Sequence, residues 1–128
     1  MRFRLAAANL LLLGLACGLG ESTQVRLHPI DGGPVSGQVA LRETFCKNPC
    51  VTSTFDLQGG GDLRGVARWG SCAAPGAQLG GDLSTDPTFA EPISMVSGLE
   101  DLSGKACIQV VRDAVDGSRA VLACGDVP

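Results

Sequence analysis

The feature that most constrains this chain is a series of short runs in which apolar and polar residues alternate. In one run, Val35, Val39 and Leu41 fall on one face of an extended strand, and polar side chains fall on the other. Turn signals separate the runs, among them the glycines at 59–61 and the Asp-Gly pair at 116–117. Short strands at this spacing predict an all-β domain, either a Greek-key β-sandwich or a flattened barrel.

The N-terminus has the pattern of a secretory leader. Two arginines precede a mostly apolar run over residues 5–16, and small residues follow it. The run is too short for a good transmembrane span, so we expect a signal peptide over 1–20 and one β domain over 21–128. The alternative is a bacterial lipoprotein in the periplasm, in which Cys17 is the lipidated residue and provides the chain's one contact with a membrane.

The charge balance excludes two classes of partner. The whole chain has a net charge of −3, and without the two leader arginines this falls to −5. Nucleic acids and anionic membranes attract basic surfaces. The sequence therefore predicts neither as a partner of the mature domain.

The chain has six cysteines, of which Cys17 lies in the expected leader, and the five that follow a secretory leader predict disulfide bonds. Cys46 and Cys50 flank a Lys-Asn-Pro turn, so we expect a bridge that closes a hairpin. In reduced form the same two sulfurs would suit Cu(I), or would act as a reversible thiol–disulfide couple. Both alternatives stay open at this point.

Five short blocks follow one another in a recognisable order. Residues 33–43 begin Gly-Pro-Val-Ser-Gly, residues 81–84 read Gly-Asp-Leu-Ser, and residues 117–125 run from Gly-Ser-Arg to Ala-Cys-Gly. Residues 102–110 form an apolar strand after a Leu-Ser-Gly turn. In a known protein family, one segment reads Leu-His-Gly-Phe-His-Val-His and is followed by a glycine and a cysteine. Residues 63–72 keep the leucine, both glycines and the cysteine of that segment. Together the blocks resemble the copper/zinc superoxide dismutase family, which implies its Greek-key fold.

The resemblance also implies that the family's metal ligands have been lost. The family binds copper and zinc through several histidines and one aspartate, whereas this chain has one histidine, His28, outside every matched position. Asp82 alone keeps a ligand's identity, and a lone carboxylate holds copper or zinc poorly, so we expect no cofactor. Other residues occupy the positions of the lost ligands, among them Ala67, Trp69, Leu79 and Val110.

The resemblance assigns roles to several of the remaining residues. It pairs Cys72 with Cys124 in the family's intrasubunit disulfide and leaves Cys107 as a buried thiol, although the sequence keeps other pairings open. The two loops that would enclose the metals and guide the substrate are short here. We expect Trp69 to fill the space of the missing metals.

Two charged residues of the matched blocks also receive expectations. Asp82 follows two glycines, so we expect it to cap a turn and not to bind a metal. Arg119 follows the Gly-Ser of its block, and we expect it to be a solvated surface residue.

These features predict a secreted, non-catalytic domain with a structural or protein-binding role. Members of the family form dimers, which implies a homodimer of this chain, or a heterodimer with an active superoxide dismutase relative. The alternatives are residual dismutase activity and Cu(I) binding through Cys46 and Cys50.

Overall fold

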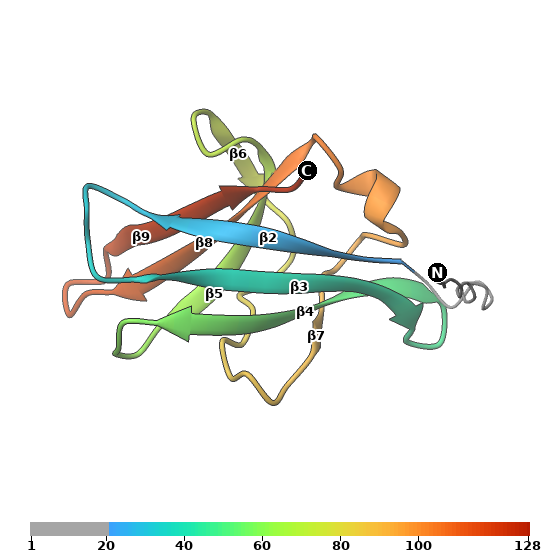
Figure 1. The fold of residues 1–128 in the computed structure, drawn as a ribbon, viewed down its shortest axis with the longest axis horizontal. Helices are drawn as coiled ribbons and strands as arrows, with labels where there is room; N and C mark the ends of the chain where they lie inside the picture. Colours follow the sequence, from blue (N-terminus) through green and yellow to red (C-terminus); the bar gives the residue numbers. More distant parts are fainter. Residues whose placement is uncertain (1–20) are drawn as a thin grey trace, which may run out of the picture.

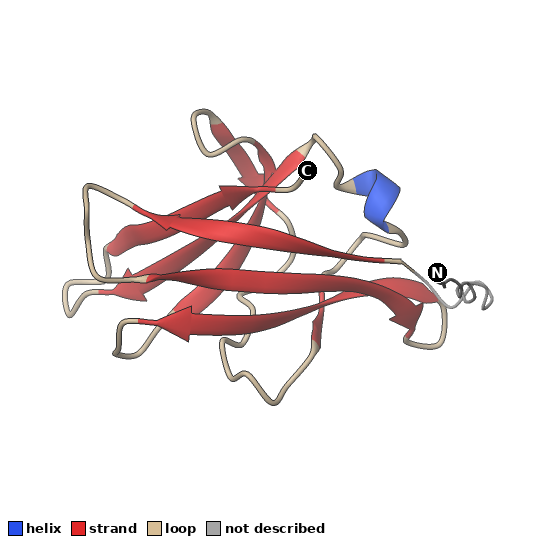
Figure 2. Ribbon diagram, in the orientation of Figure 1, coloured by secondary structure: helices blue, strands red, loops and turns tan. Residues whose placement is uncertain are grey.

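A computed structural model describes residues 21–128, and the expected leader at 1–20, which includes Cys17, lies outside the described residues. Nearly all regular structure in the described part is β-strand, with one short 3-10 turn (Figure 2). In chain order the elements are β2 (Ser22–Pro29), β3 (Ser36–Phe45), β4 (Pro49–Gln58), β5 (Arg64–Gly70), β6 (Pro75–Gln78), β7 (Glu91–Pro92), the 3-10 turn η2 (Leu99–Asp101), β8 (Ala106–Asp113) and β9 (Arg119–Asp126).

The strands form one antiparallel sheet that curls into a half-barrel, in the order β6-β5-β8-β9-β2-β3-β4-β7. Strands β2, β3 and β4 are consecutive neighbours, but the chain then crosses the barrel so that β5 pairs with β8. Figure 1 shows β2, β3 and β4 side by side, with β5, β8 and β9 crossing behind them. The prediction of an all-β domain is confirmed at this level.

Alternation along the strands builds the core. Val25 and Leu27 of β2 are buried together with Val39 and Leu41 of β3, while the residues between them face outward. Phe55 of β4 is the largest fully buried side chain. Burying one large apolar side chain contributes about 1.5–3 kcal/mol, so the inward faces of these strands hold the two sides of the half-barrel together.

Gly65 of β5 is required by the close approach of the two sides. A Cβ atom at this position would lie 2.4 Å from Cζ of Phe55. That distance is far below van der Waals contact, so only glycine lets the Phe55 ring approach β5 this closely. The backbone of Gly65 also pairs with that of Leu83 through two hydrogen bonds, of 2.9 and 2.7 Å, which fix Leu83 to β5.

One run of alternating apolar residues does not form a strand in the described part of the chain. The apolar residues Ile93, Met95 and Leu99 suggest a strand in the sequence, but β7 ends at Pro92. Ile93 is buried, whereas Met95 has a φ of 68° and is 79% exposed. The chain turns at Met95, and Leu99 then begins η2, so these apolar residues reach the core from a loop and not from a strand.

The loop after β5 is one of the two loops that the resemblance predicts to be short, and it contains the short strand β6. Arg68 of β5 fixes this loop, because its Nη1 donates a 2.9 Å hydrogen bond to the carbonyl oxygen of Gly76. Its Nε donates a 2.9 Å hydrogen bond to Oε1 of Gln109 on β8. Both faces of β8 are buried as a result, the inner one by the core and the outer one beneath Arg68 and the segment that carries Cys72.

Candidate functional site

Two disulfide bonds staple the barrel. Cys46 and Cys50 close the β3–β4 hairpin, and Cys72, in the loop after β5, is joined to Cys124 of β9. The Cα atoms are 5.9 Å apart in both bonds, an ordinary distance for a disulfide. Both pairs are those expected from the sequence, and Cys107 is left as a buried free thiol.

Three positions of the expected lost metal ligands lie inside the apolar core. Ala67 of β5, Leu79 after β6 and Val110 of β8 are all completely buried and belong to one packed cluster. None of the three side chains carries a donor atom. Hydrocarbon side chains thus occupy all three positions, and none of them can bind a metal ion.

Trp69 does not fill this space, which corrects the expectation from the sequence. It is the penultimate residue of β5 and is 36% exposed. The pairing of β5 with β6 shifts register between Arg68 and Gly70, and Gly70 has a φ of 94°. The strand therefore ends one residue after Trp69, whose side chain is partly exposed to solvent.

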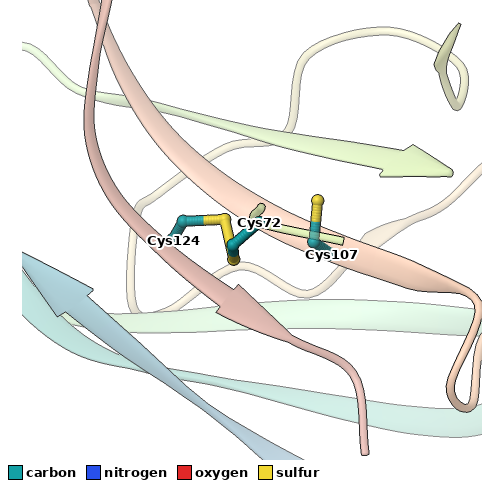
Figure 3. Close-up of side chains that lie close together, drawn as sticks. All are labelled: Cys72, Cys107 and Cys124. Atoms are coloured by element: carbon teal, nitrogen blue, oxygen red, sulfur yellow. A yellow bond between two sulfur atoms is a disulfide. The ribbon is translucent and has the colours of Figure 1, made fainter. Parts of the chain in front are cut away.

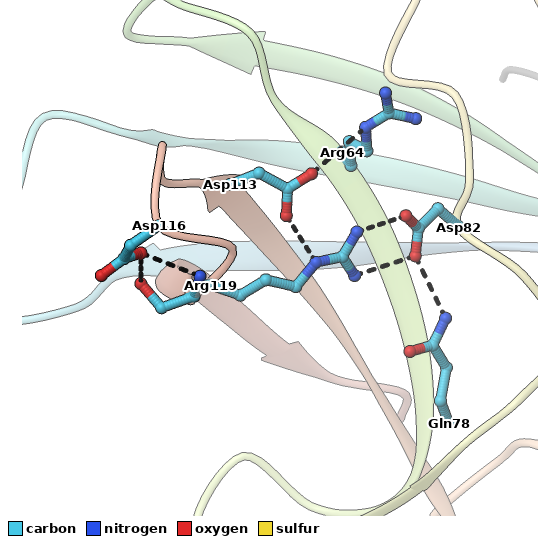
Figure 4. Close-up of polar contacts among 7 residues, drawn as sticks. Arg64, Gln78, Asp82, Asp113, Asp116 and Arg119 are labelled. Atoms are coloured by element: carbon cyan, nitrogen blue, oxygen red, sulfur yellow. Dashed lines mark hydrogen bonds and ion pairs between the residues drawn. The ribbon is translucent and has the colours of Figure 1, made fainter.

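A cluster of charged and polar side chains has Arg119 at its centre (Figure 4). The guanidinium of Arg119 donates to both carboxylate oxygens of Asp82; its Nη1–Oδ1 distance is 2.9 Å, and its Nη2 donates to Oδ2. Its Nε donates a 2.6 Å hydrogen bond to Asp113. Nε2 of Gln78 donates to Asp82 at 3.2 Å, and Nε of Arg64 lies 3.8 Å from Asp113.

The cluster sets the charge state of its members. The hydrogen bonds from Arg119 lower the pKa of Asp82 below its usual range, against a smaller opposing effect of burial. The same hydrogen bonds, followed by those with Asp113, raise the pKa of Arg119. Asp82 and Arg119 are therefore both charged at neutral pH, and a paired fork of this geometry is stronger than a single ion pair.

This geometry gives Asp82 and Arg119 a contact that the sequence does not predict. Asp82 accepts its hydrogen bonds from the side chains of Arg119 and Gln78 and not from the backbone of a turn, and Arg119 lies at the surface as expected but is held in an ion pair. The sequence carries no local signal for the pair, because its members lie 37 positions apart. A metal at Asp82 would have to displace the arginine.

A second cluster is made of sulfur. The sulfur atoms of Cys72, Cys107 and Cys124 all lie within 4.8 Å of one another. Figure 3 shows the free thiol of Cys107 beside the bond between the other two. Among residues 21–128 this is the one group of three histidine, cysteine or acidic side chains close enough to share an ion. Sequence reasoning places the pair and the free thiol separately and misses that the three meet.

Burial raises the pKa of the Cys107 thiol, and the negative charge of Asp126 adds to this effect. The thiol is therefore protonated at neutral pH and is a poor nucleophile. His28, the one histidine, is exposed near the end of β2 and lies directly opposite Cys124 on the neighbouring strand. Directly opposed residues share a face, so His28 borders the disulfide from outside.

No helix in the described part of the chain is long and apolar enough to cross a membrane. A search of protein-family models, of curated proteins and of solved structures finds no match to this chain.

Proposed function

We propose that this chain is a non-catalytic domain resembling copper/zinc superoxide dismutase, in which apolar packing and an ion pair take the place of the metals. The domain would act outside the cytoplasm in a structural or protein-binding role. The observation that carries the proposal is the fork of Arg119 on Asp82, the one residue that keeps a ligand's identity in the resemblance.

The chemistry of the neighbouring positions supports this reading. Redox copper needs several nitrogen or sulfur donors, and zinc sites use histidine, cysteine or carboxylate ligands. Ala67, Leu79 and Val110 offer none and are fully buried. Asp82 is the remaining donor, and the guanidinium of Arg119 occupies both of its oxygens. A positive side chain thus supplies the charge that a metal would supply beside this carboxylate.

The topology supports the proposed kinship. In the sheet, β9 lies between β8 and β2, and β5 pairs with β8 and not with β4, which precedes it in the chain. A Greek-key arrangement has connections of this kind. The bond between Cys72 and Cys124 ties the loop after β5 to the last strand, which is the pairing that the resemblance implies.

The two intramolecular disulfides fit an oxidising environment of the extracellular type. We propose secretion through the leader at 1–20. A lipoprotein anchored at Cys17 in a bacterial periplasm meets the same redox requirement and is the alternative.

Exposed apolar side chains favour protein binding as the role. Phe45 at the tip of the β3–β4 hairpin is 77% exposed, and Phe89 and Met95 on either side of β7 are also exposed. Large exposed apolar residues of this kind are enriched where proteins meet. A second copy of this chain, or an active superoxide dismutase relative, is the partner that the resemblance implies.

A dismutase assay tests the loss of activity. The disulfide-bonded protein is incubated with excess Cu²⁺ and Zn²⁺, desalted and compared with an intact copper/zinc superoxide dismutase treated in the same way. We expect the rate to stay at that of metal-free protein. Metal-dependent dismutation that a chelator removes would overturn the proposal, and His28→Ala would then show whether the single histidine takes part.

Sedimentation velocity tests the binding role. We expect self-association, or a mixed species when an active dismutase relative is added. A monomer under both conditions would contradict the proposed partners, whatever the outcome of the activity assay.

A further inference from the structure

The sulfur cluster brings together three segments that are distant in sequence. Cys72 lies in the loop after β5, Cys107 in β8 and Cys124 in β9, and all three sulfur atoms lie within 4.8 Å of one another (Figure 3). Two of the three are bonded, so in the oxidised protein they cannot bind a metal as thiolates. Their reduction would leave three thiols within 4.8 Å of one another.

We propose that reduction of the Cys72–Cys124 bond converts this cluster into a three-thiolate binding site for Cu(I). A dithiol reductant supplies two electrons and two protons; the bond between the two sulfurs breaks, two thiols form, and the reductant closes into its own disulfide. Cu(I) then binds the sulfurs of Cys72, Cys107 and Cys124, and their protons pass to solvent. The copper changes no oxidation state in this step.

The spacing suits the ion. With metal–sulfur bonds of about 2.3 Å, three sulfurs arranged in a plane around one ion lie about 4 Å apart. The three sulfurs already lie within 4.8 Å of one another, so no strand has to move. Cys72 is half-buried in a loop, and rotation of its side chain separates the two formerly bonded sulfurs.

The donor set selects Cu(I) over zinc. Thiolates are soft ligands, and Cu(I) is a soft ion that accepts three of them, whereas structural zinc sites almost always have four protein ligands. Within residues 21–128 the group consists of three sulfurs with no fourth ligand atom close enough to join them. Zinc bound here would need a fourth ligand that the cluster does not supply.

The charges around the cluster act in both directions on its thiols. Arg68 lies directly opposite Cys107 in the pairing of β5 with β8, so the two side chains share a face, and the charge of Arg68 lowers the pKa of the Cys107 thiol. Burial and the negative charge of Asp126 outweigh this effect and raise that pKa, so Cu(I) has to displace the proton when it binds. One oxygen of Asp126 already accepts a 2.7 Å hydrogen bond from the backbone N–H of Cys72.

The same groove gives access to the bond. Its lining includes both bonded cysteines, together with Pro29 and Ile30 from β2 and the turn after it. A reductant can therefore reach the disulfide from outside, while the core behind β8 and β9 stays closed. Cys107 itself is fully buried, which protects it from larger oxidants.

Cu(I) titration of matched variants tests the site. All proteins carry Cys46→Ala and Cys50→Ala, so that the cluster supplies the only thiols of the mature chain. They are reduced under argon with a phosphine, which takes its oxygen from water, and are then desalted. Cu(I) is added in competition with bathocuproine disulfonate, whose colour reports the copper that the protein does not hold.

We expect one Cu(I) per reduced chain, no Cu(I) in the disulfide-bonded chain, and a loss of affinity by at least an order of magnitude in Cys107→Ser. Serine is close to cysteine in size but offers no soft donor, which makes it the matched control. Equal affinity in Cys107→Ser, or no binding by the reduced chain, would overturn the proposal. So would tighter retention of Zn²⁺ than of Cu(I) against the same concentration of competing chelator.

Loss of the disulfide can unfold the protein, so circular dichroism is recorded in each titration. If the reduced chain unfolds, Cu(I) should restore the β spectrum at one equivalent, because binding free energy then becomes folding free energy. Copper binding without return of the β spectrum would show thiols of a disordered chain and would overturn the site. This test uses reduced protein and Cu(I), so its failure is distinct from dismutase activity in the oxidised protein.

Discussion

The disulfide between Cys72 and Cys124 should stabilise the fold more than the bond between Cys46 and Cys50. The first pair is separated by 52 residues and the second by 4. In the chain-entropy model these loops restrict the unfolded chain by about 4 and about 2 kcal/mol, a difference of about 2 kcal/mol in favour of the long bridge. For a domain of this size that difference corresponds to about 10 °C in melting temperature.

Thermal melts and urea titrations of two double variants measure the effect. Cys72→Ala/Cys124→Ala should melt well below Cys46→Ala/Cys50→Ala, and Cys107→Ala, which keeps both bridges, serves as the control for removal of a buried sulfur. Equal slopes in the urea titrations would show that the same surface unfolds in each variant. A lower melting temperature for the hairpin variant would refute the argument from loop length and make the hairpin bond the main staple.

Three further predictions concern the core and the ion pair. Gly65→Ala should lower the unfolding free energy in urea by about 1–3 kcal/mol because the new methyl group would overlap the Phe55 ring, and Phe55→Leu in the same chain should recover part of the loss; no recovery would show that the ring is not the cause. Leu79→Ala should cost about 2–5 kcal/mol in the same assay by leaving a cavity, and a loss typical of surface substitutions, within about 0.5 kcal/mol, would contradict its burial. The pKa of Asp82 is lowered in the folded protein, so the stabilisation by Arg119 should be complete above the unfolded-state value of about 3.9 and be lost as the pH falls through the lower folded value. Melts of wild type and Asp82→Asn across this range should converge at low pH, and a constant difference would contradict the ion pair.

Local patterns predict the strands because alternation reports which face of a strand is buried. Val35, Val39 and Leu41 are marked as inward by their spacing, and all three are fully buried. The hairpin bond follows from turn chemistry around Cys46 and Cys50. Met95 misleads the same reasoning, because a backbone turn with positive φ interrupts the alternation and places this apolar side chain outside.

The two clusters depend on strand register, which no local pattern reports. Arg119 meets Asp82 because β9 pairs with β8 and the segment before Ser84 is fixed to β5. Cys107 meets the disulfide because Gln109, two residues along β8, lies opposite Cys124. Residues separated by tens of positions are brought together by strand pairings that the local sequence does not report.

The metal content of the disulfide-bonded protein tests most directly whether an ion pair with Arg119 has replaced a metal at Asp82. The protein is incubated with Cu²⁺ and Zn²⁺, dialysed against metal-free buffer and measured by inductively coupled plasma mass spectrometry beside Asp82→Asn. The account predicts less than stoichiometric copper and zinc, with no difference between the two proteins, because Arg119 already occupies the carboxylate. One copper or zinc ion per chain that disappears in Asp82→Asn would show a metal site at this position and contradict the account.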